Sequence, residues 1–249
     1  MYNFSHGVAV AASMLLLSLV FASPPTSPHP KGLFTKRSSI TAPHQGKGTN
    51  WGGNWKGGNC VFAYWDQPAR YPEIAMGGDN WDDGLYCGAC IEVQSGPNPP
   101  VVGIVGDKCP SCERESLDLD PEMWRRVSGG ASPSIIPIKW KVVPCQFNKL
   151  PMLLVKKEGM SQWWFAVQVA QSGQPVLSLK YRPVGTQAWQ NTKRDTNSNY
   201  FMSAGGIPAG KAADIKVCCA DGKTEIITPN VDLSGPGVVH AHGNCPPSL

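Results

Sequence analysis

Glycine and proline interrupt this chain every few residues, with 27 glycines and 23 prolines among 249 residues. Both residues interrupt helices and strands, so the chain is expected to fold into short strands joined by turns rather than into long helices. Together they make up about a fifth of the chain, less than the roughly 25–30% typical of low-complexity disordered sequences. With 41% hydrophobic and 16% charged residues, the chain can form a packed core, and a coiled coil is excluded.

The N-terminus has the pattern of a secretory signal peptide. Residues 8–21 form an apolar run of 14 residues, which is too short to span a bilayer and typical of a signal-peptide core. Small residues at Val20 and Ala22 predict cleavage after Ala22, so residues 1–22 are expected to be removed and the protein to be secreted. No second apolar run reaches the length of a membrane span, and no membrane partner is expected.

Residues 23–46 are rich in proline and serine and poor in large apolar side chains. Such a segment cannot bury enough surface to offset its ordering entropy, so we expect it to be disordered. Within it, Lys36 and Arg37 form a dibasic pair. The pair is either a cleavage site that ends a propeptide at residue 37 or two solvated charges in a flexible segment, and both interpretations stay open.

The nine cysteines and the charges divide the rest of the chain into two parts. In a chain with a signal peptide, nine cysteines predict an oxidising compartment and a disulfide framework. Residues 47–146 contain six cysteines and carry nine Lys/Arg against twelve Asp/Glu, whereas residues 149–249 contain three cysteines and ten Lys/Arg against six Asp/Glu. Each part has the size of an ordinary domain. The net charge of +4 is too small to indicate a nucleic-acid partner.

Hydrophobic patterns predict strands in both parts. In the first part, the runs with strand length are residues 91–93, 101–105 and 136–143. Residues 120–127 predict a helix of about two turns, because Asp120 is a favourable N-cap, Pro121 suits the first helical position and two arginines stand in the last turn. In the second part, the alternating runs are residues 164–169, 176–181 and 214–218, which favours a β-sandwich.

A series of motifs resembles the expansin family. In chain order, the first part contains GTNWGG at residues 48–53, GGNC at 57–60, GLYCGAC at 84–90, GDKCP at 106–110, LDL at 117–119 and VVPC at 142–145. The second part contains KKEG at residues 156–159 and WWFAVQV at 163–169. Single motifs of this kind are weak, but the ordered set is specific and covers roughly residues 47–235.

The resemblance implies an all-β protein with two domains. The first is a six-stranded double-psi β-barrel in residues 47–146, and the second is an immunoglobulin-like β-sandwich that binds cellulose in residues 149–249, with a flexible C-terminal tail. Expansins loosen plant cell walls by disturbing noncovalent glucan contacts without hydrolysis. The resemblance therefore implies a monomeric extracellular protein whose partners are cellulose and plant cell-wall matrix polysaccharides, with no cofactor and no metal.

Residues of the barrel match both expansins and family 45 glycoside hydrolases, which invert configuration with two aspartates. Inverting hydrolysis needs two carboxyl groups about 6.5–9.5 Å apart. Asp118 stands at the position of the acid, but Gly53 stands at the position of the base, so we expect no enzymatic activity. The resemblance implies instead that Thr49, Trp51, Asp107 and Asp118 line a polysaccharide groove, in which a tryptophan ring can support a sugar ring.

The tandem tryptophans Trp163 and Trp164 are the second candidate site. A regular strand would direct one ring to the core, but related modules present both rings at the surface as a cellulose-binding platform. Tyr200 lies nearest to the family position of a third ring, and Trp189 is the alternative. Lys157 either matches a basic position beside the platform or is a solvated surface lysine.

The resemblance also implies three disulfides, namely Cys60–Cys87, Cys90–Cys145 and Cys109–Cys112. Many bacterial expansins have a groove tyrosine where this chain has Cys109. The CPSC spacing is also found in redox and zinc sites, but no thioredoxin-like context and no second pair at zinc spacing accompany it, which favours a structural disulfide. Either Cys218 or Cys219 is expected to pair with Cys245, because adjacent strand residues point to opposite faces.

Three other functions stay open on the sequence. A weak inverting endoglucanase of the family 45 type would release reducing sugar from soluble glucan. A lytic transglycosylase of the barrel superfamily would act on peptidoglycan. A carbohydrate-binding protein that does not loosen walls is the third. A defence-type, barwin-like lectin would need only the barrel, and the Trp163–Trp164 segment argues against it.

Overall fold

The computed structural model describes Met1 and residues 40–130, 132, 134–147, 150–203, 205 and 212–248. The predicted signal peptide and the segment with Lys36 and Arg37 lie outside these residues. Every helix and strand below belongs to the unit Lys31–Leu249. Among the residues described, no helix is long and apolar enough to cross a membrane.

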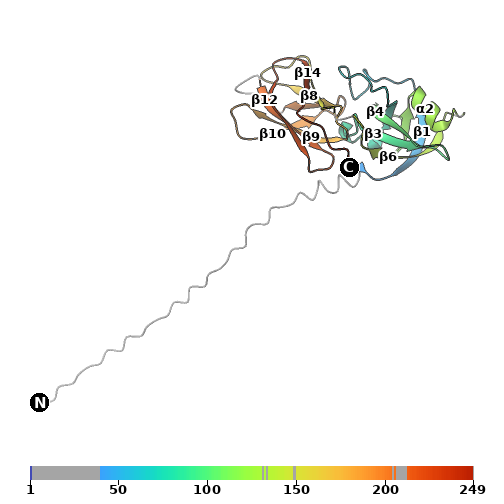
Figure 1. Ribbon diagram of the computed structural model, residues 1–249, viewed down its shortest axis with the longest axis horizontal. Coiled ribbons are helices and arrows are strands. Elements are labelled where there is room, and N and C mark those ends of the chain that lie inside the picture. The colour runs from blue at the N-terminus through green and yellow to red at the C-terminus, as the bar shows by residue number, and fades with distance from the viewer. Residues whose placement is uncertain are drawn as a thin grey trace. The chain divides into compact units, whose positions relative to one another are not determined.

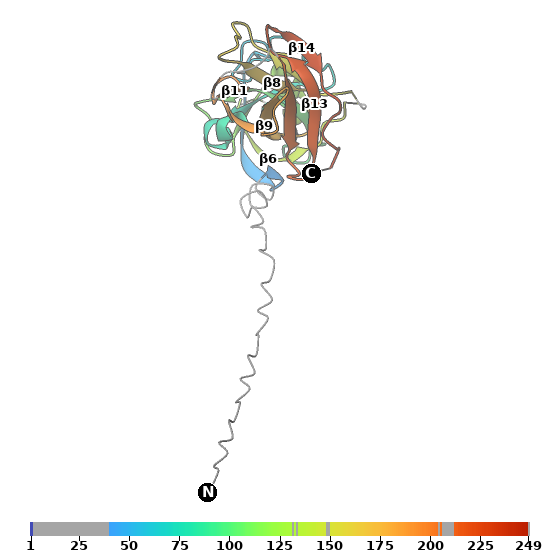
Figure 2. The same cartoon turned by 90° about the vertical axis from the view of Figure 1, so that its left-hand side faces the viewer.

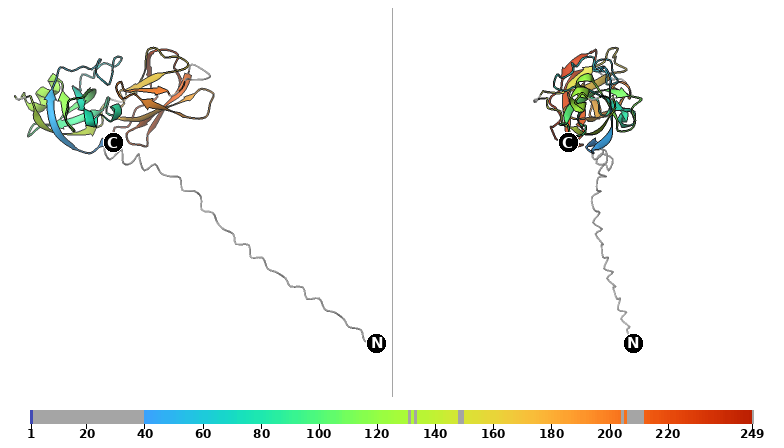
Figure 3. Two further views of the ribbon diagram at one scale, coloured as in Figure 1. Left: turned by 180° about the vertical axis from the view of Figure 1, so that it is seen from behind. Right: turned by 90° about the vertical axis from the view of Figure 1, so that its right-hand side faces the viewer.

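The first six strands close into a barrel, whose β1, β3, β4 and β6 are labelled in Figure 1. The strands are β1 (His44–Asn50), β2 (Glu73–Gly77), β3 (Cys90–Gln94), β4 (Val101–Cys109), β5 (Leu117–Leu119) and β6 (Ile136–Val143). Around the barrel the order is β1-β5-β2-β4-β3-β6, with β1–β5 and β2–β4 parallel and the other pairs antiparallel. Figure 3 shows the same strands from behind. The predicted six-stranded barrel is confirmed.

The other eight strands form one antiparallel sheet that folds over its own core (Figure 2). They are β7 (Leu153–Lys156), β8 (Ala166–Ala170), β9 (Val176–Pro183), β10 (Gln190–Arg194), β11 (Tyr200–Ser203), β12 (Ala212–Cys219), β13 (Glu225–Asp232) and β14 (Gly237–His240). Their order is β13-β12-β9-β10-β11-β8-β7-β14. The predicted all-β sandwich class is confirmed, whereas the exact domain boundaries at residues 146 and 149 stay predictions.

Local sequence patterns explain the two best-predicted elements. In β6, Ile136, Ile138, Trp140 and Val142 are buried and alternate with exposed or partly exposed residues, so one face of the strand packs in the barrel. The helix α2 (Pro121–Ser128) begins after Asp120, whose side chain accepts a hydrogen bond from the Met123 backbone N–H at 2.7 Å. Single-turn 3-10 helices, η1 (Gly78–Asn80) and η2 (Asp82–Gly84), follow β2.

Four disulfides join eight of the nine cysteines, all of which lie among the described residues: Cys60–Cys87, Cys90–Cys145, Cys109–Cys112 and Cys219–Cys245. The first three are the pairs that the resemblance implies. Cys219 is fully buried beside Cys245, whereas Cys218 points to the other face of β12 and has no disulfide partner. In the chain-entropy model, the bridges separated by 27, 55 and 26 residues each stabilise the fold by about 4 kcal/mol, and the bridge separated by 3 residues contributes about 2 kcal/mol.

Hydrogen bonds from two buried side chains, Trp81 and Gln168, and from the partly buried Arg194 connect the barrel to the second sheet. Arg194 donates a hydrogen bond to the Gly84 carbonyl at 2.5 Å. Trp81 Nε1 donates to the Thr196 carbonyl at 2.6 Å, and Gln168 Nε2 donates to the Cys60 carbonyl at 2.7 Å. Burial lowers the pKa of Arg194 to about 10, although the charges of Asp82 and Asp83 oppose this shift. The Gly84 carbonyl also accepts the Cys87 backbone N–H at 3.1 Å, whereas loss of Gln168 would remove the side-chain donor from the carbonyl of buried Cys60.

Candidate functional site

One row of residues crosses four neighbouring strands of the barrel. Thr49 on β1 is in register with Asp118 on β5, Asp118 with Ala75 on β2, and Ala75 with Asp107 on β4. Residues in register on neighbouring strands point to the same face of a sheet. Because neighbouring strands lie about 4.8 Å apart, the backbones of Asp118 and Asp107 are separated by about 10 Å, with the small side chain of Ala75 between them.

Thr49 and Asp118 are in direct contact. The Thr49 hydroxyl donates a hydrogen bond to Asp118 Oδ1 at 2.6 Å, and both side chains are half-buried. Burial raises the pKa of Asp118, and the hydrogen bond from Thr49 opposes the shift without cancelling it. The pair therefore presents a carboxyl group that is fixed in place and still partly open to a ligand hydroxyl.

Asp107 is engaged with its own backbone surroundings. Its Oδ1 atom accepts hydrogen bonds from the backbone N–H groups of Asn59 at 2.6 Å and Lys108 at 2.7 Å. A Cβ atom on Gly58 would lie 2.6 Å from Asp107 Cγ, so only glycine allows this approach. Asp107 thus holds the loop at residues 57–60.

Trp51 directly follows β1 and is half-buried. Its backbone N–H donates a hydrogen bond to the Leu119 carbonyl at 3.1 Å.

A buried carboxyl group lies beside Gly53, and sequence reasoning missed it. Glu73 is 1% exposed, and its Oε2 atom accepts a hydrogen bond from the Asn54 backbone N–H at 2.8 Å. Burial raises the pKa of Glu73 to about 7; the Asn54 bond opposes this shift, and the charges of Asp107 and Asp120 add to it. The available signal was a glutamate at the start of the otherwise apolar run that forms β2.

Gly53 itself cannot easily be replaced by an acidic residue. Its φ angle is +80°, in the left-handed region that glycine favours. A Cβ atom there would lie 3.3 Å from Glu73 Oε2. The position that matches the hydrolase base therefore has no side chain, and the buried carboxyl group of Glu73 lies next to it.

Trp163 and Trp164 lie at the tip of the hairpin between β7 and β8. Trp163 is 73% exposed and Trp164 is half-buried. Ser161 and Trp164 exchange two backbone hydrogen bonds, at 2.8 and 3.2 Å, so the chain turns here and regular strand geometry begins only at Ala166. Phe165 takes the core position instead, with its ring centroid 4.8 Å from that of Tyr181. The strand expected to begin at residue 164 therefore starts two residues later, and neither tryptophan enters the core.

The expectation that Tyr200 supplies an open third ring is wrong. Tyr200 lies on β11, an interior strand between β10 and β8, and is 2% exposed. The Lys157 ammonium lies over its ring, 4.7 Å from the centroid, so Lys157 covers an aromatic ring beside the hairpin. The alternative, Trp189, is partly exposed and has the charged groups of Arg182 and Lys216 within 4.8 and 4.5 Å of its ring centroid.

An exposed tyrosine that sequence reasoning missed lies next to the tryptophan hairpin. Tyr64, from the loop after Cys60, is 46% exposed and donates its hydroxyl to Glu158 Oε1 at 2.5 Å. The two residues are 94 positions apart, and no local pattern indicates their contact. Tyr64 thereby places an aromatic ring of the first part beside the hairpin of the second.

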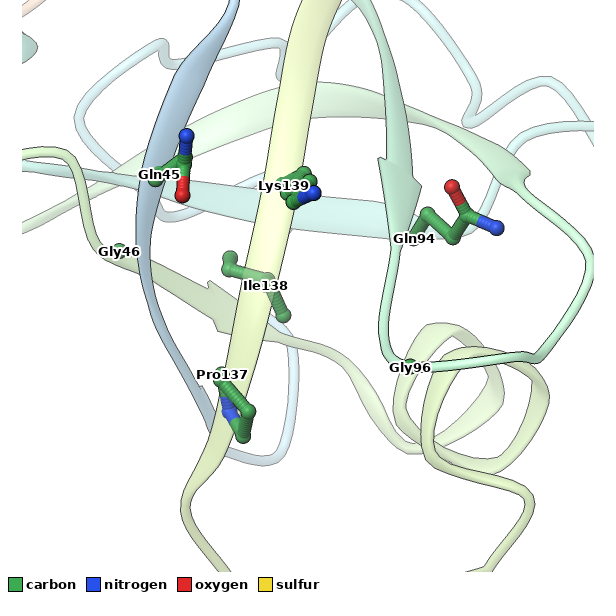
Figure 4. Close-up of a pocket in the computed structure, with 7 residues that line it drawn as sticks. All are labelled: Gln45, Gly46, Gln94, Gly96, Pro137, Ile138 and Lys139. Carbon is green, nitrogen blue, oxygen red and sulfur yellow. The ribbon is translucent and has the colours of Figure 1, made fainter.

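A pocket of about 350 Å³ lies elsewhere on the barrel, between β1, β6 and the end of β3 (Figure 4). Its lining residues are Gln45, Gly46, Gln94, Gly96, Pro137, Ile138 and Lys139. It contains no carboxyl group, no aromatic ring and none of the predicted groove residues. The pocket therefore does not compete with the Thr49–Asp118 row as the candidate site.

Comparison with known proteins identifies the relatives of this chain. No family model matches it. Expansin-YoaJ of Bacillus subtilis (strain 168) is 30% identical over 164 residues, which are 64% of this chain and 67% of that protein. The chain belongs to the expansin family. The crystal structure of the apo expansin of Clavibacter michiganensis matches this expansin with a TM-score of 0.70 and 25% identity, covering 82% of this chain and 98% of the other.

A mutant form of the Clavibacter michiganensis expansin in complex with cellohexaose matches with a TM-score of 0.70 and 24% identity. In the expansin described here, the structure brings Thr49 together with Asp118 and keeps Trp163 and Trp164 out of the core. Asp107 is hydrogen-bonded to the backbone of a neighbouring loop, and Tyr200 is too buried to form part of the candidate platform.

Proposed function

We propose that this expansin is a secreted protein that binds cellulose through Trp163 and Trp164 and loosens plant cell walls without hydrolysis. The observation that carries the proposal is the 73% exposure of Trp163 at a hairpin tip, with Trp164 half-buried beside it and Phe165 filling the core. An exposed tryptophan next to a second, half-buried one presents apolar surface of the kind found at ligand-binding sites. The apolar face of a pyranose ring fits such a surface, because it stacks on a flat ring without requiring charge.

In the barrel, Thr49 and Asp118 are proposed to hold a glucan by hydrogen bonds to its hydroxyl groups. The observed Thr49–Asp118 bond fixes the carboxyl group, so little side-chain entropy is lost when a sugar binds. Asp118 has no partner carboxylate at Gly53, which supports gripping rather than inverting hydrolysis. The cellohexaose bound by the Clavibacter expansin supports a glucan as the ligand class.

Secretion and extracellular action are supported by the four disulfides, since such bridges persist in oxidising compartments. The polymers proposed as partners are cellulose and the matrix polysaccharides of plant walls. The proposal needs no cofactor for either the binding step or the loosening step.

A cellulose pull-down tests the platform. Trp163→Ala, Trp164→Ala and the double variant are compared with Ile227→Ala, which removes an exposed apolar side chain on β13, away from the hairpin. At about 1–3 kcal/mol per stacked ring, by analogy with base stacking, the double variant should lose retention on crystalline cellulose while Ile227→Ala keeps it. Retention of the folded double variant at the wild-type level would refute the platform.

Extension of a clamped cell-wall strip, run beside a sugar-release assay, tests the loosening. The expected result is extension under load with no soluble cello-oligosaccharides. Sustained release of such oligosaccharides, lost in Asp118→Asn, would replace the proposal with the endoglucanase alternative.

A further inference from the structure

The disulfide between Cys109 and Cys112 lies against the carboxyl group of Asp118. The two sulfur atoms and a carboxylate oxygen of Asp118 all lie within 4.8 Å of one another. Cys109 is the last residue of β4, and Cys112 follows in a turn in which its backbone N–H donates to the Cys109 carbonyl at 3.3 Å. Neither the tryptophan platform nor the gripping of a glucan requires this disulfide, so its position beside Asp118 needs a separate explanation.

This disulfide differs from the other three in access and in loop length. Cys112 is half-buried, whereas both cysteines of each other bridge are buried. Its sequence separation is 3, against 26 or more for the others. A short loop restricts the unfolded chain least, so opening this bridge costs the fold less than opening any other. It can therefore be reduced while the remaining bridges hold the protein together.

We propose that Cys109 and Cys112 form a thiol–disulfide exchange site for small extracellular thiols, with Asp118 as its proton carrier. A thiolate RS⁻ attacks Sγ of the accessible Cys112, the Cys109–Cys112 bond breaks, and Cys109 leaves with the electron pair and takes the proton of the Asp118 carboxylic acid. A second thiolate then attacks the mixed disulfide at its RS sulfur, which forms RSSR and releases Cys112 as a thiolate. The two protons that the RSH molecules lose to solvent on ionising then protonate Cys112 and restore the acid form of Asp118. Overall, two RSH are oxidised to RSSR, and the protein disulfide is reduced to two thiols.

The surroundings of Cys109 fit the role given to Asp118. Exchange is faster when the leaving sulfur is stabilised, and a positioned acid does this by supplying a proton. Cys109 is only 7% exposed, which limits the access of bulk water to it and favours a neighbouring protein group as the proton donor. Burial raises the pKa of Asp118, which favours its acid form. The Ser111 hydroxyl, 3.8 Å from Cys109 Sγ, is a second polar neighbour.

The first test counts the thiols that open. The full chain carrying Cys218→Ser, which removes the free cysteine, is equilibrated in graded mixtures of reduced and oxidised glutathione, acid-quenched, alkylated and analysed by peptide mass spectrometry. We expect Cys109 and Cys112 to be alkylated at thiol concentrations that leave the other three disulfides intact. If the Cys109–Cys112 bridge opens only together with the others, or after them, the exchange site is refuted.

The second test concerns Asp118. In the same background, Asp118→Asn should slow reduction of this bridge at least about tenfold and flatten the dependence of the rate on pH, because the amide cannot supply a proton. Glu113→Gln is the matched control: it neutralises an exposed carboxylate near the same turn, which pairs with Lys47 at 2.9 Å. Equal rates in the two variants would refute the role of Asp118. Both readouts are independent of cellulose binding.

Discussion

Replacing Glu73 by glutamine tests how strongly the barrel depends on a buried acid. Glu73 is 1% exposed, its Oε1 atom has no hydrogen-bond partner among the described residues, and its pKa is raised from 4.5 to about 7. Glutamine has nearly the same shape and cannot ionise. Its carbonyl oxygen can still accept the Asn54 N–H, so the variant removes the charge and keeps the contact.

The magnitude follows from linkage between protonation and folding. The folded protein binds the Glu73 proton more tightly than the unfolded chain does, so the free energy of unfolding falls as pH rises from about 4.5 to about 7. A shift of about 2.5 pKa units corresponds to a loss of about 3 kcal/mol once both states are ionised, at about pH 8. Below pH 4.5 Glu73 is protonated in both states and this loss is absent.

The assay is chemical denaturation of wild type and Glu73→Gln at several pH values between 4 and 8. The unfolding free energy of the variant minus that of wild type should rise by about 3 kcal/mol across this range, whatever its value at pH 4. Glu122→Gln is the control, because Arg125 lowers the pKa of this exposed carboxylate. The unfolding free energy of this variant minus that of wild type should therefore change little between pH 4 and 8, and it should fall rather than rise. A difference for Glu73→Gln that stays flat with pH would refute the reasoning.

Three further predictions use other parts of the structure. Asp118→Asn should reduce wall extension at least about tenfold, because it removes a charged hydrogen-bonding group, and leave cellulose retention unchanged; equal loss in both assays would contradict separate sites. Gly53→Asp should lower the unfolding free energy by about 1–3 kcal/mol, since φ is +80° and Glu73 is adjacent, and should release no sugar from soluble glucan. Arg194→Lys should lower the unfolding free energy by about 2 kcal/mol, or Tm by roughly 5 °C. Lysine cannot donate to both the Gly84 and the Val176 carbonyls as the guanidinium does, and an unchanged melting curve would argue against this prediction.

Elements governed by local patterns could be predicted from the sequence. The helix α2 follows from Asp120, Pro121 and the late arginines, and β6 follows from strict alternation, because both signals act within a few residues. The exposure of Trp163 and Trp164 was expected only through the family resemblance. Alternation alone would have placed one ring in the core, and the Ser161–Trp164 turn that prevents this has no clear sequence signal.

Contacts that depend on distant strands could not be predicted in this way. Thr49 and Asp118 are 69 residues apart and meet because β1 and β5 are parallel neighbours. The burial of Tyr200 depends on β11 lying inside the sheet, which its own sequence does not reveal. The raised pKa of Glu73 results from burial and from charges on other elements, so it has no counterpart in a motif.

The pairing of β14 with β7 has a consequence for how the chain matures. The strands of the barrel all precede residue 144, whereas β7 obtains one of its two neighbours only from Gly237–His240. During synthesis the barrel can therefore close while β7 still presents an unpaired, largely apolar edge, which is prone to pairing with other chains. We expect the nascent protein to need shielding until its last strand emerges, and a chain shortened before residue 237 to be retained or degraded even though its barrel is complete.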